Sequence, residues 1–584
     1  MGQIGPAAKK AVPKLLEIIS RGDYISEDVA EAVSCIGVDD LSLVPNLVHA
    51  HYDPRDEANA ILADLIVGLG RDAIRMVIIE MSRNTDDWDK LRFAGRILRR
   101  LRAGKALAKA LKSKHARIRF SAAFALGELR KRAIKAIPAL IEALDDKSEK
   151  VRDRVFDTLE QLGPVAAEAT PALITRLGDQ DWRARSMARD ALVKIGEAAV
   201  PLLTEALKHQ DEDVRSESCS ALGSIGESAK DAVSELIPLL SDLSNRVRAS
   251  AAHALGDTRT DPAEAVKQLP EMLNSEDHET ASSAARALGK LKVESAIPIL
   301  VERMENWSED TPEIDALGAM GEVALPAVQE MLQRPQRPYQ MINLLAALGR
   351  NCLPILEDVV PIIFDEFLAD DNYDGNEYAS SLVRDLTPEI IPVVVEKTKD
   401  ADERMRAGAV STMACFHGED AIGHDEIVRS LGEDKSALVR REVVNYLGYR
   451  NLDPDDLGLI VNALADEDYE LSSAAQEILL NQGRRAEEIA PMIVDLIKQS
   501  DKKSGLDLST ILGFMGKSII PLLLDLLKDE NPHARAEAVR ALSLIEEPSE
   551  DIVAPLLEAM SDSEAKVRSA AAQCLGNAGK AAKD

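Results

Sequence analysis

The largest group of residues that could bind a ligand is a basic segment from Lys90 to Lys135. It contains sixteen lysines and arginines and one acid, Glu128, so its formal charge is +15. Like charges at this density cost stability unless an anion compensates them, which predicts a surface for an acidic ligand. The candidate binding residues in this segment are Arg92, Arg96, Arg99, Lys105, Lys109, Lys112, Arg117 and Arg119.

Helical spacing groups these basic side chains. Arg92, Arg96 and Arg99 lie at i, i+4 and i+7, opposite an apolar stripe that begins at Leu91. The lysines at 105, 109 and 112 repeat this spacing on the next predicted helix. We therefore expect the whole segment 90–135 to form one basic docking patch.

Three ligands would suit this basic patch. An acidic protein partner is the interpretation we favour. The acidic regions of this protein itself, within or between chains, are a second possibility. Nucleic acid or another polyanion is a third, but a net charge of -30 repels phosphates, and the patch has few aromatic residues beyond Phe93, Phe120 and Phe124.

An acidic stretch supplies the other candidate for ligand chemistry. Asp370, Asn372, Asp374 and Gly375 match the first half of a calcium loop, with oxygen ligands at alternate positions and a glycine for the turn. The glutamate expected at the twelfth position is replaced by Ser381. We therefore expect a solvated loop between helices, with a calcium site as the alternative.

No residue pattern in the chain predicts catalysis or a cofactor. The nine histidines are scattered, and none forms a cluster with metal or triad spacing. Five cysteines, an odd number spread over the chain, do not make a disulfide framework. Cys35 and Cys574 stand two residues before a repeated glycine, where alanine stands in other copies, so we expect both in the core.

The elements that must position these residues are pairs of helices. A phrase of the form Asp-x-Val-Arg…Ala-Leu-Gly returns about every thirty residues, after a phrase of the form x-Pro-x-Leu-Leu. The proline predicts the first turn of the first helix. The second helix runs from Val-Arg to Leu-Gly, and we expect its closing glycine, such as Gly223 or Gly256, to end it in a left-handed conformation.

The prolines predicted in first turns are Pro13, Pro45, Pro138, Pro171, Pro201, Pro238, Pro270, Pro298, Pro326, Pro361, Pro392, Pro491, Pro521 and Pro555. An arginine recurs in the second helix, at positions 152, 215, 248, 440 and 568. A repeated arginine beside a repeated aspartate predicts a ladder of contacts between adjacent units.

These phrases resemble HEAT repeats, in the short form often labelled bilin-lyase-type. The resemblance covers nearly the whole chain and implies an all-α fold, a right-handed α-α superhelix of about eighteen helix-turn-helix repeats. The resemblance is strong over 103–291 and 518–579, weaker over 1–102 and weakest over 303–400. We therefore divide the chain into divergent repeats at 1–102, regular repeats at 103–302, irregular repeats at 303–400 and C-terminal repeats at 401–584. The irregular part is where we expect the curvature to change.

We expect a non-catalytic scaffold that binds a protein partner, with an acidic surface, along an extended face. The resemblance also implies an enzymatic alternative, a subunit that attaches or isomerises bilins, although no pocket of cysteine, histidine and aromatic residues supports it. The apolar runs are too short to span a bilayer and no signal peptide begins the chain, so we expect a cytoplasmic protein. The residues from Gly2 to Pro6 match an inter-repeat segment, which predicts a piece of a longer array.

Overall fold

The computed structural model describes residues 8–20, 26–49, 57–259, 263–306, 312–334, 340–369, 373–448, 450, 452–481, 485–499, 508–545 and 550–577. Every regular element in these ranges is a helix, which confirms the all-α prediction. The chain divides into two compact units. The N-terminal unit comprises Met1–Met304 and Thr311–Met320, and the C-terminal unit comprises Glu305–Asp310 and Gly321–Asp584.

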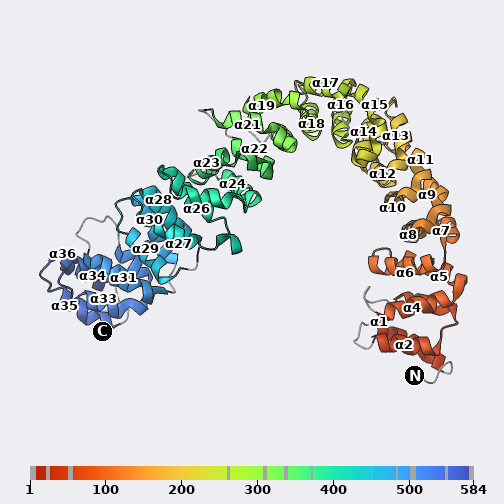
Figure 1. The fold of residues 1–584 in the computed structure, drawn as a ribbon. Helices are drawn as coiled ribbons and strands as arrows, with labels where there is room; N and C mark the ends of the chain where they lie inside the picture. Colours follow the sequence, from red (N-terminus) through yellow and green to blue (C-terminus); the bar gives the residue numbers. More distant parts are fainter. Residues whose placement is uncertain are drawn as a thin grey trace. The chain divides into compact units, whose positions relative to one another are not determined.

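Helices alternate between two rows within the N-terminal unit (Figure 1). The first helices are α1 (Val12–Ser20), α3 (Val44–His49), α5 (Ala73–Arg83), α7 (Gly104–Ala110), α9 (Ile137–Ala143), α11 (Thr170–Arg176), α13 (Val200–Ala206), α15 (Val233–Leu236), α17 (Ala263–Met272) and α19 (Ile297–Asn306). The second helices are α2 (Ser26–Ile36), α4 (Glu57–Gly68), α6 (Trp88–Arg100), α8 (Ala116–Leu129), α10 (Glu149–Leu162), α12 (Trp182–Ile195), α14 (Glu212–Ile225), α16 (Asn245–Asp257), α18 (His278–Lys290) and α20 (Pro312–Met320).

The C-terminal unit continues the alternation. Its first helices are α21 (Leu325–Leu332), α23 (Leu356–Phe367), α25 (Ile390–Lys397), α27 (His424–Ser430), α29 (Pro454–Ala463), α31 (Ala486–Gln499), α33 (Ile520–Leu526) and α35 (Val553–Ala559). Its second helices are α22 (Met341–Leu348), α24 (Tyr373–Leu386), α26 (Glu403–Met413), α28 (Ala437–Gly448), α30 (Tyr469–Asn481), α32 (Leu508–Phe514), α34 (Pro532–Leu544) and α36 (Ala565–Asn577).

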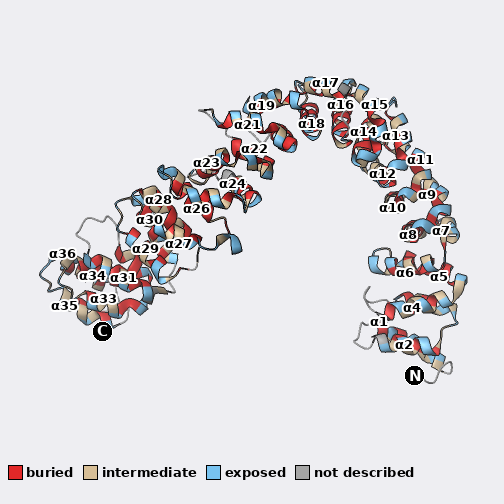
Figure 2. Ribbon diagram, in the orientation of Figure 1, coloured by how far each residue is buried: buried red, intermediate tan, exposed pale blue. Residues whose placement is uncertain are grey.

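Small and branched apolar residues form the core between neighbouring helices. In α16, Val247, Ala251, Ala254 and Leu255 have no exposed surface, as the helical spacing predicts. Figure 2 shows such buried residues on helices throughout both units. Each repeat therefore buries its apolar faces against neighbouring repeats, as expected for stacked repeats.

Polar residues in the turns begin the second helices. Oδ1 of Asp211 accepts a hydrogen bond from the backbone N–H of Asp213 at 2.9 Å, which caps α14. Asp277 caps α18 through the N–H of Thr280, also at 2.9 Å. These bonds satisfy backbone donors that have no partner inside a helix.

The prolines occupy two kinds of position. Pro138, Pro171 and Pro201 lie in the first turn, as predicted. Pro270, Pro361 and Pro491 lie inside α17, α23 and α31, so the prediction is wrong for these three. In these three repeats the helix starts several residues before the proline, whereas the helices of Pro138, Pro171 and Pro201 each start one residue before the proline, directly after a 3-10 helix.

The repeated glycine does not end the second helix, contrary to the prediction. Gly223 lies inside α14, and a Cβ placed on it would be 2.9 Å from Cα of Ala254 in α16. The residue with positive φ is Gly226, at 71°, directly after the helix. Gly223 is therefore required because the adjacent second helices α14 and α16 approach closely there.

The predicted arginine ladder joins adjacent repeats. Arg215 donates from Nε and Nη2 to the two carboxylate oxygens of Asp242, at 2.9 and 3.0 Å, and from Nη1 to the carbonyl of His209. Arg440 makes the same paired contact with Asp466, which confirms the ladder at both positions. Arg152, Arg248 and Arg568 instead bond the backbone carbonyls of their own turns.

The predicted irregular segment 303–400 contains the boundary between the two units, at residues 304–321. Within the C-terminal unit, α26 packs against its own first helix, α25, and also against α23, the first helix of the preceding repeat. A Cβ on Gly408 of α26 would lie 2.3 Å from Cβ of Phe364 in α23, so the two helices are in close contact there.

No single helix in the described ranges is long and apolar enough to cross a membrane. The bent pair Leu508–Phe514 and Lys517–Leu526 passes that test together, by length and composition only.

Candidate partner-binding surface

The predicted binding arginines of α6 lie on the side of the helix away from the core. Leu91 and Leu98 have no exposed surface, whereas Arg92 is exposed and Arg96 and Arg99 are half-buried. No described acid forms an ion pair with these three guanidinium groups. They therefore present uncompensated positive charge along one second helix.

The predicted lysines belong to the other row of helices. Lys105 and Lys109 are exposed on α7, a first helix, and Lys112 lies two residues after its end. Nζ of Lys112 lies 2.7 Å from Oε2 of Glu142, and both side chains are largely exposed. The structure thus divides the predicted basic patch between two rows instead of forming one face.

Arg119 is a rung of the ladder. Its Nε and Nη2 donate to the carboxylate of Asp146 at 2.5 and 2.7 Å, and the residue is only 5% exposed. Burial acts to raise the pKa of Asp146, but hydrogen bonds from Arg119 and from the N–H of Ser148 hold it below its ordinary value. Arg119 occupies the same slot as Arg215, directly after an apolar residue. The phase of the repeat could have separated it from Arg117, which is exposed.

Equivalent positions at the start of successive second helices form a row on the N-terminal unit. The residue two after the N-cap is Arg117 in α8, Lys150 in α10, Arg183 in α12, Asp213 in α14, Arg246 in α16 and Glu279 in α18. We call these residues the N2 row. The equivalent residue of α6, which precedes this row, is the acid Asp89. The first three members of the row, on α8 to α12, are cations, and the sign then alternates.

Ion pairs within the N2 row differ from one end to the other. Arg246 pairs with Asp213 of the preceding repeat. Arg183 lies 3.6 Å from Asp153, with both side chains partly exposed. Neither Arg117 nor Lys150 has an ion-pair partner in the described part of the chain.

A hollow of about 180 Å³ lies between the ends of α8 and α10. Its lining consists of Thr85, Asp86, Ala116, Arg117, Phe120, Ser148, Lys150 and Val151. Both unpaired cations of the N2 row thus reach one recess, together with an aromatic ring and an aliphatic side chain. The recess can take an apolar group between two positive charges.

An aromatic cluster supports the wall of this hollow. The guanidinium carbon of Arg154 lies 4.9 Å from the ring centre of Trp88, 5.2 Å from Phe120 and 5.4 Å from Phe124. Burial lowers the pKa of Arg154, which Asp157 opposes through an ion pair at 3.2 Å. Stacking over three rings holds this cation in place. Sequence reasoning missed Trp88, Lys150 and Arg154, because they lie far apart in the chain.

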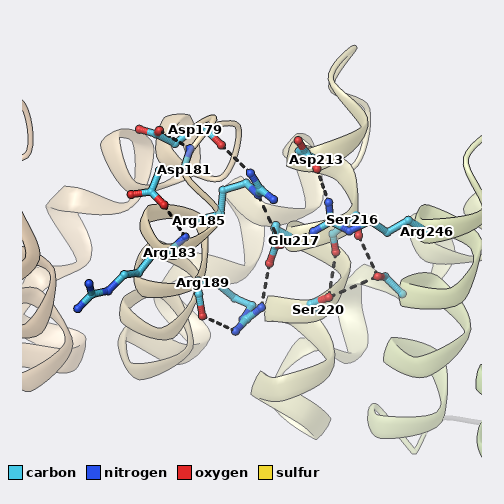
Figure 3. A network of polar contacts seen from close by, with 12 residues as sticks. Asp179, Asp181, Arg183, Arg185, Arg189, Asp213, Ser216, Glu217, Ser220 and Arg246 are labelled. Carbon is cyan, nitrogen blue, oxygen red and sulfur yellow. Dashed lines mark hydrogen bonds and ion pairs between the residues drawn. The ribbon is translucent and has the colours of Figure 1, made fainter.

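A second recess, of about 530 Å³, crosses four second helices from α12 to α18. It is lined by Arg189, Asp190, Ser220, Ser224, Ala249, Ser250, His253, His278, Glu279, Ser282, Ser283 and Arg286. Figure 3 shows the polar network beside it. Glu217, almost fully buried, accepts hydrogen bonds from Arg189 at 3.0 Å and Arg246 at 2.6 Å. This network neutralises its own charges, unlike the start of the N2 row.

The calcium-loop candidate is only partly covered by the structure. Asp370 and Asn372 lie outside the described residues, as does the side chain of Asp374. The backbone of Asp374 and Gly375 belongs to α24, so these positions are helical and do not form the turn that a calcium loop needs. Among the described residues, no three His, Cys, Asp or Glu side chains are grouped to hold a metal.

The cysteine predictions fare differently. Cys574 is buried, as expected, but Cys35 is exposed, so its assignment to the core is wrong. Cys35 lies near the end of α2, on the side away from the buried residues Val33 and Ile36.

Stacked helix pairs, a ladder between repeats and open rows of helix ends define an α-helical repeat protein. The chain matches the family of HEAT repeats over residues 104–193, 170–256, 233–311 and 490–576, which together cover just over half of its length. It therefore belongs to the HEAT-repeat family. The bilin-lyase subtype implied by the sequence resemblance is not part of this match.

Solved structures similar to this chain include importin beta in an ammonium sulfate condition, at 13% identity and a TM-score of 0.39, with 99% of this chain and 86% of that chain covered. Kap121p is similar at 12% identity and a TM-score of 0.36, covering 97% and 83%. Kap121p bound to Nup53p has 13% identity and a TM-score of 0.31, covering 100% and 89%. Such low TM-scores carry no information on function. No curated protein sequence matches this chain significantly.

Proposed function

We propose that this HEAT-repeat protein is a non-catalytic scaffold that binds an acidic protein partner along the second helices of its N-terminal unit. Arg92, Arg96 and Arg99 of α6, with Arg117 of α8, are the docking residues. The observation that carries the proposal is that these cations have no described ion-pair partner in a chain of net charge -30. An acidic partner would supply the missing negative charge.

The division of the predicted patch between two rows gives the proposal a matched control. Reversing Arg92, Arg96 and Arg99 to Glu removes positive charge from α6. Reversing Lys105 and Lys109 to Glu does the same on α7, in the other row. If the partner lies along the second helices, only the α6 reversal abolishes most of the binding.

Fluorescence anisotropy with a labelled polyglutamate peptide as the probe tests this difference. We expect the α6 variant to bind at least roughly tenfold more weakly than the parent and with a flatter salt dependence. The α7 variant should lose less than about threefold. Equal losses in both variants, or no loss in either, would overturn the proposed docking site.

The two remaining ligands of the basic surface are outcomes of the same experiment. If an oligothymidylate probe binds more tightly than polyglutamate, the ligand of this surface is nucleic acid and not an acidic protein. Contact with acidic regions of this protein itself would appear as self-association in sedimentation velocity that the α6 reversal abolishes. Either outcome would contradict the proposed partner.

A further inference from the structure

The start of the N2 row places three cations on consecutive second helices. Arg117, Lys150 and Arg183 stand at equivalent positions of α8, α10 and α12, and these helices pack in that order. Further along the row, Asp213 and Arg246 compensate each other. The cation run therefore differs from the following two positions of the row, which compensate each other.

The positive charges of these three cations are largely uncompensated within the described part of the chain. Arg117 and Lys150 have no ion-pair partner among the described residues. The pair between Arg183 and Asp153, at 3.6 Å and partly exposed, is weak because solvent screens it, so a ligand can replace it. Nearby acids are Asp86 at the hollow, Asp89 at the equivalent position of α6 and Glu149 next to Lys150. None of the three forms an ion pair with these cations among the described residues.

The spacing of the row selects one peptide conformation. Packed helices lie about 8–10 Å apart, so successive N2 side chains are separated by a similar distance. A polyproline II segment has three residues per turn and rises about 3.1 Å per residue, which returns a side chain to the same face every ~9 Å. A β-strand places residues i and i+3 on opposite faces and cannot match the row.

We propose that Arg117, Lys150 and Arg183 bind an acidic partner segment in the polyproline II conformation, with Asp or Glu at every third position. This assignment rests on the proposed function and names the partner's chemistry. The three carboxylates meet the three cations in turn. The hollow between Arg117 and Lys150 holds an intervening apolar side chain, such as proline, against Phe120 and Val151.

The row also limits the length of the acidic pattern. The next N2 residue is Asp213, which already pairs with Arg246. A fourth acid at the next third position would therefore face a carboxylate and gain nothing. Three acids at this spacing are the optimum.

Two labelled peptides of equal composition test the spacing. One repeats Glu-Pro-Ala so that three glutamates lie three residues apart. The other places the same three glutamates together. We expect the spaced peptide to bind the full chain at least roughly fivefold more tightly by fluorescence anisotropy. A peptide with a fourth spaced glutamate should bind no more tightly than the one with three.

Variants connect the binding to the row. Combined Arg117→Ala, Lys150→Ala and Arg183→Ala should weaken the spaced peptide by roughly tenfold and remove its preference over the clustered peptide. The variant Arg117→Lys, Lys150→Arg and Arg183→Lys keeps every charge and should retain the preference. Combined Lys105→Ala and Lys109→Ala on α7 should change neither value.

The outcomes separate this assignment from the proposed function. If both peptides bind equally and only α6 reversal weakens them, the N2 assignment is wrong and the acidic-partner scaffold stands. If neither peptide binds and polyglutamate does not bind either, both are wrong. Retained preference in the triple alanine variant, with its circular dichroism unchanged, would also overturn the N2 assignment.

Discussion

Arg535 holds the carboxylate of Asp562, a residue of the next repeat, through two hydrogen bonds. Nε donates to Oδ2 at 2.7 Å and Nη2 donates to Oδ1 at 2.9 Å. Both side chains are largely buried, at 13% and 12% exposure. The hydrogen bonds from Arg535 lower the pKa of Asp562 to about 2 from an ordinary 3.8, although burial opposes this shift. Contacts of this kind fix the register of one repeat on the next.

Acid should therefore weaken the stack. A carboxyl group whose folded pKa is lowered stabilises the fold above its unfolded pKa, and that stability is lost as the pH falls through the folded value. For Asp562 the loss runs from about pH 4 to about pH 2 and amounts to about 2 kcal/mol. Thermal melting followed by circular dichroism across this range measures it.

The variant Asp562→Asn is the control for this acid sensitivity. It should unfold more easily than the parent at neutral pH, because Arg535 remains as a largely buried, unpaired cation. The difference between the two proteins should shrink as the pH approaches 2. A difference that stays constant with pH would contradict the role of the Asp562 carboxylate.

The close approach of α14 and α16 should make Gly223 intolerant of any side chain. A Cβ at Gly223 would lie 2.9 Å from the Ala254 backbone, so Gly223→Ala should cost about 1–3 kcal/mol. Gly576 holds the same place in α36 and has no atom within 4 Å of an added Cβ, so Gly576→Ala should be neutral or slightly stabilising. Urea unfolding of both variants measures the contrast, and equal effects would contradict the packing role.

The cysteines should differ strongly in reactivity. Burial raises the pKa of Cys219 to about 12, and its side chain has no exposed surface, so its thiol should resist maleimide at pH 8. Cys35 is exposed, so its thiol should react with maleimide much faster than that of Cys219. Mass spectrometry of labelled peptides distinguishes the two. Labelling of both in denaturant is the control, and fast labelling of native Cys219 would show that α14 opens readily.

Glu217 should be essential to the stability of the α12–α16 region. Its carboxylate lies at 7% side-chain exposure between Arg189 and Arg246, so Glu217→Ala would leave two cations without their acceptor. We expect a loss of about 2–4 kcal/mol. Faster amide exchange in α14 and its neighbours measures the loss. Glu212→Ala, an exposed position five residues earlier, should leave that exchange unchanged.

The sequence alone predicted most of the local architecture, but not the positions of three prolines or the role of the repeated glycine. Proline at one helix start, acidic caps at the other and apolar residues at helical spacing act within a few residues, so helix pairs can be recognised without tertiary information. The contact of Arg215 with a neighbouring repeat was also predictable. An arginine and an aspartate that both recur with the period of the repeat keep the same relative position in each pair of neighbouring repeats. Segment 90–135 was identified as basic from composition alone.

The tertiary structure decided which of these residues serve a surface and which serve the stack. Arg117 and Arg119 are two positions apart, yet one is exposed and the other is bonded to Asp146, because helix rotation turns them to different sides. Gly223 faces Ala254 only when α14 and α16 are stacked. The N2 row exists only across repeats, since its cations are about thirty residues apart in sequence and become neighbours through packing of successive helices. Local sequence determines helices, whereas the stacking of helices determines surfaces.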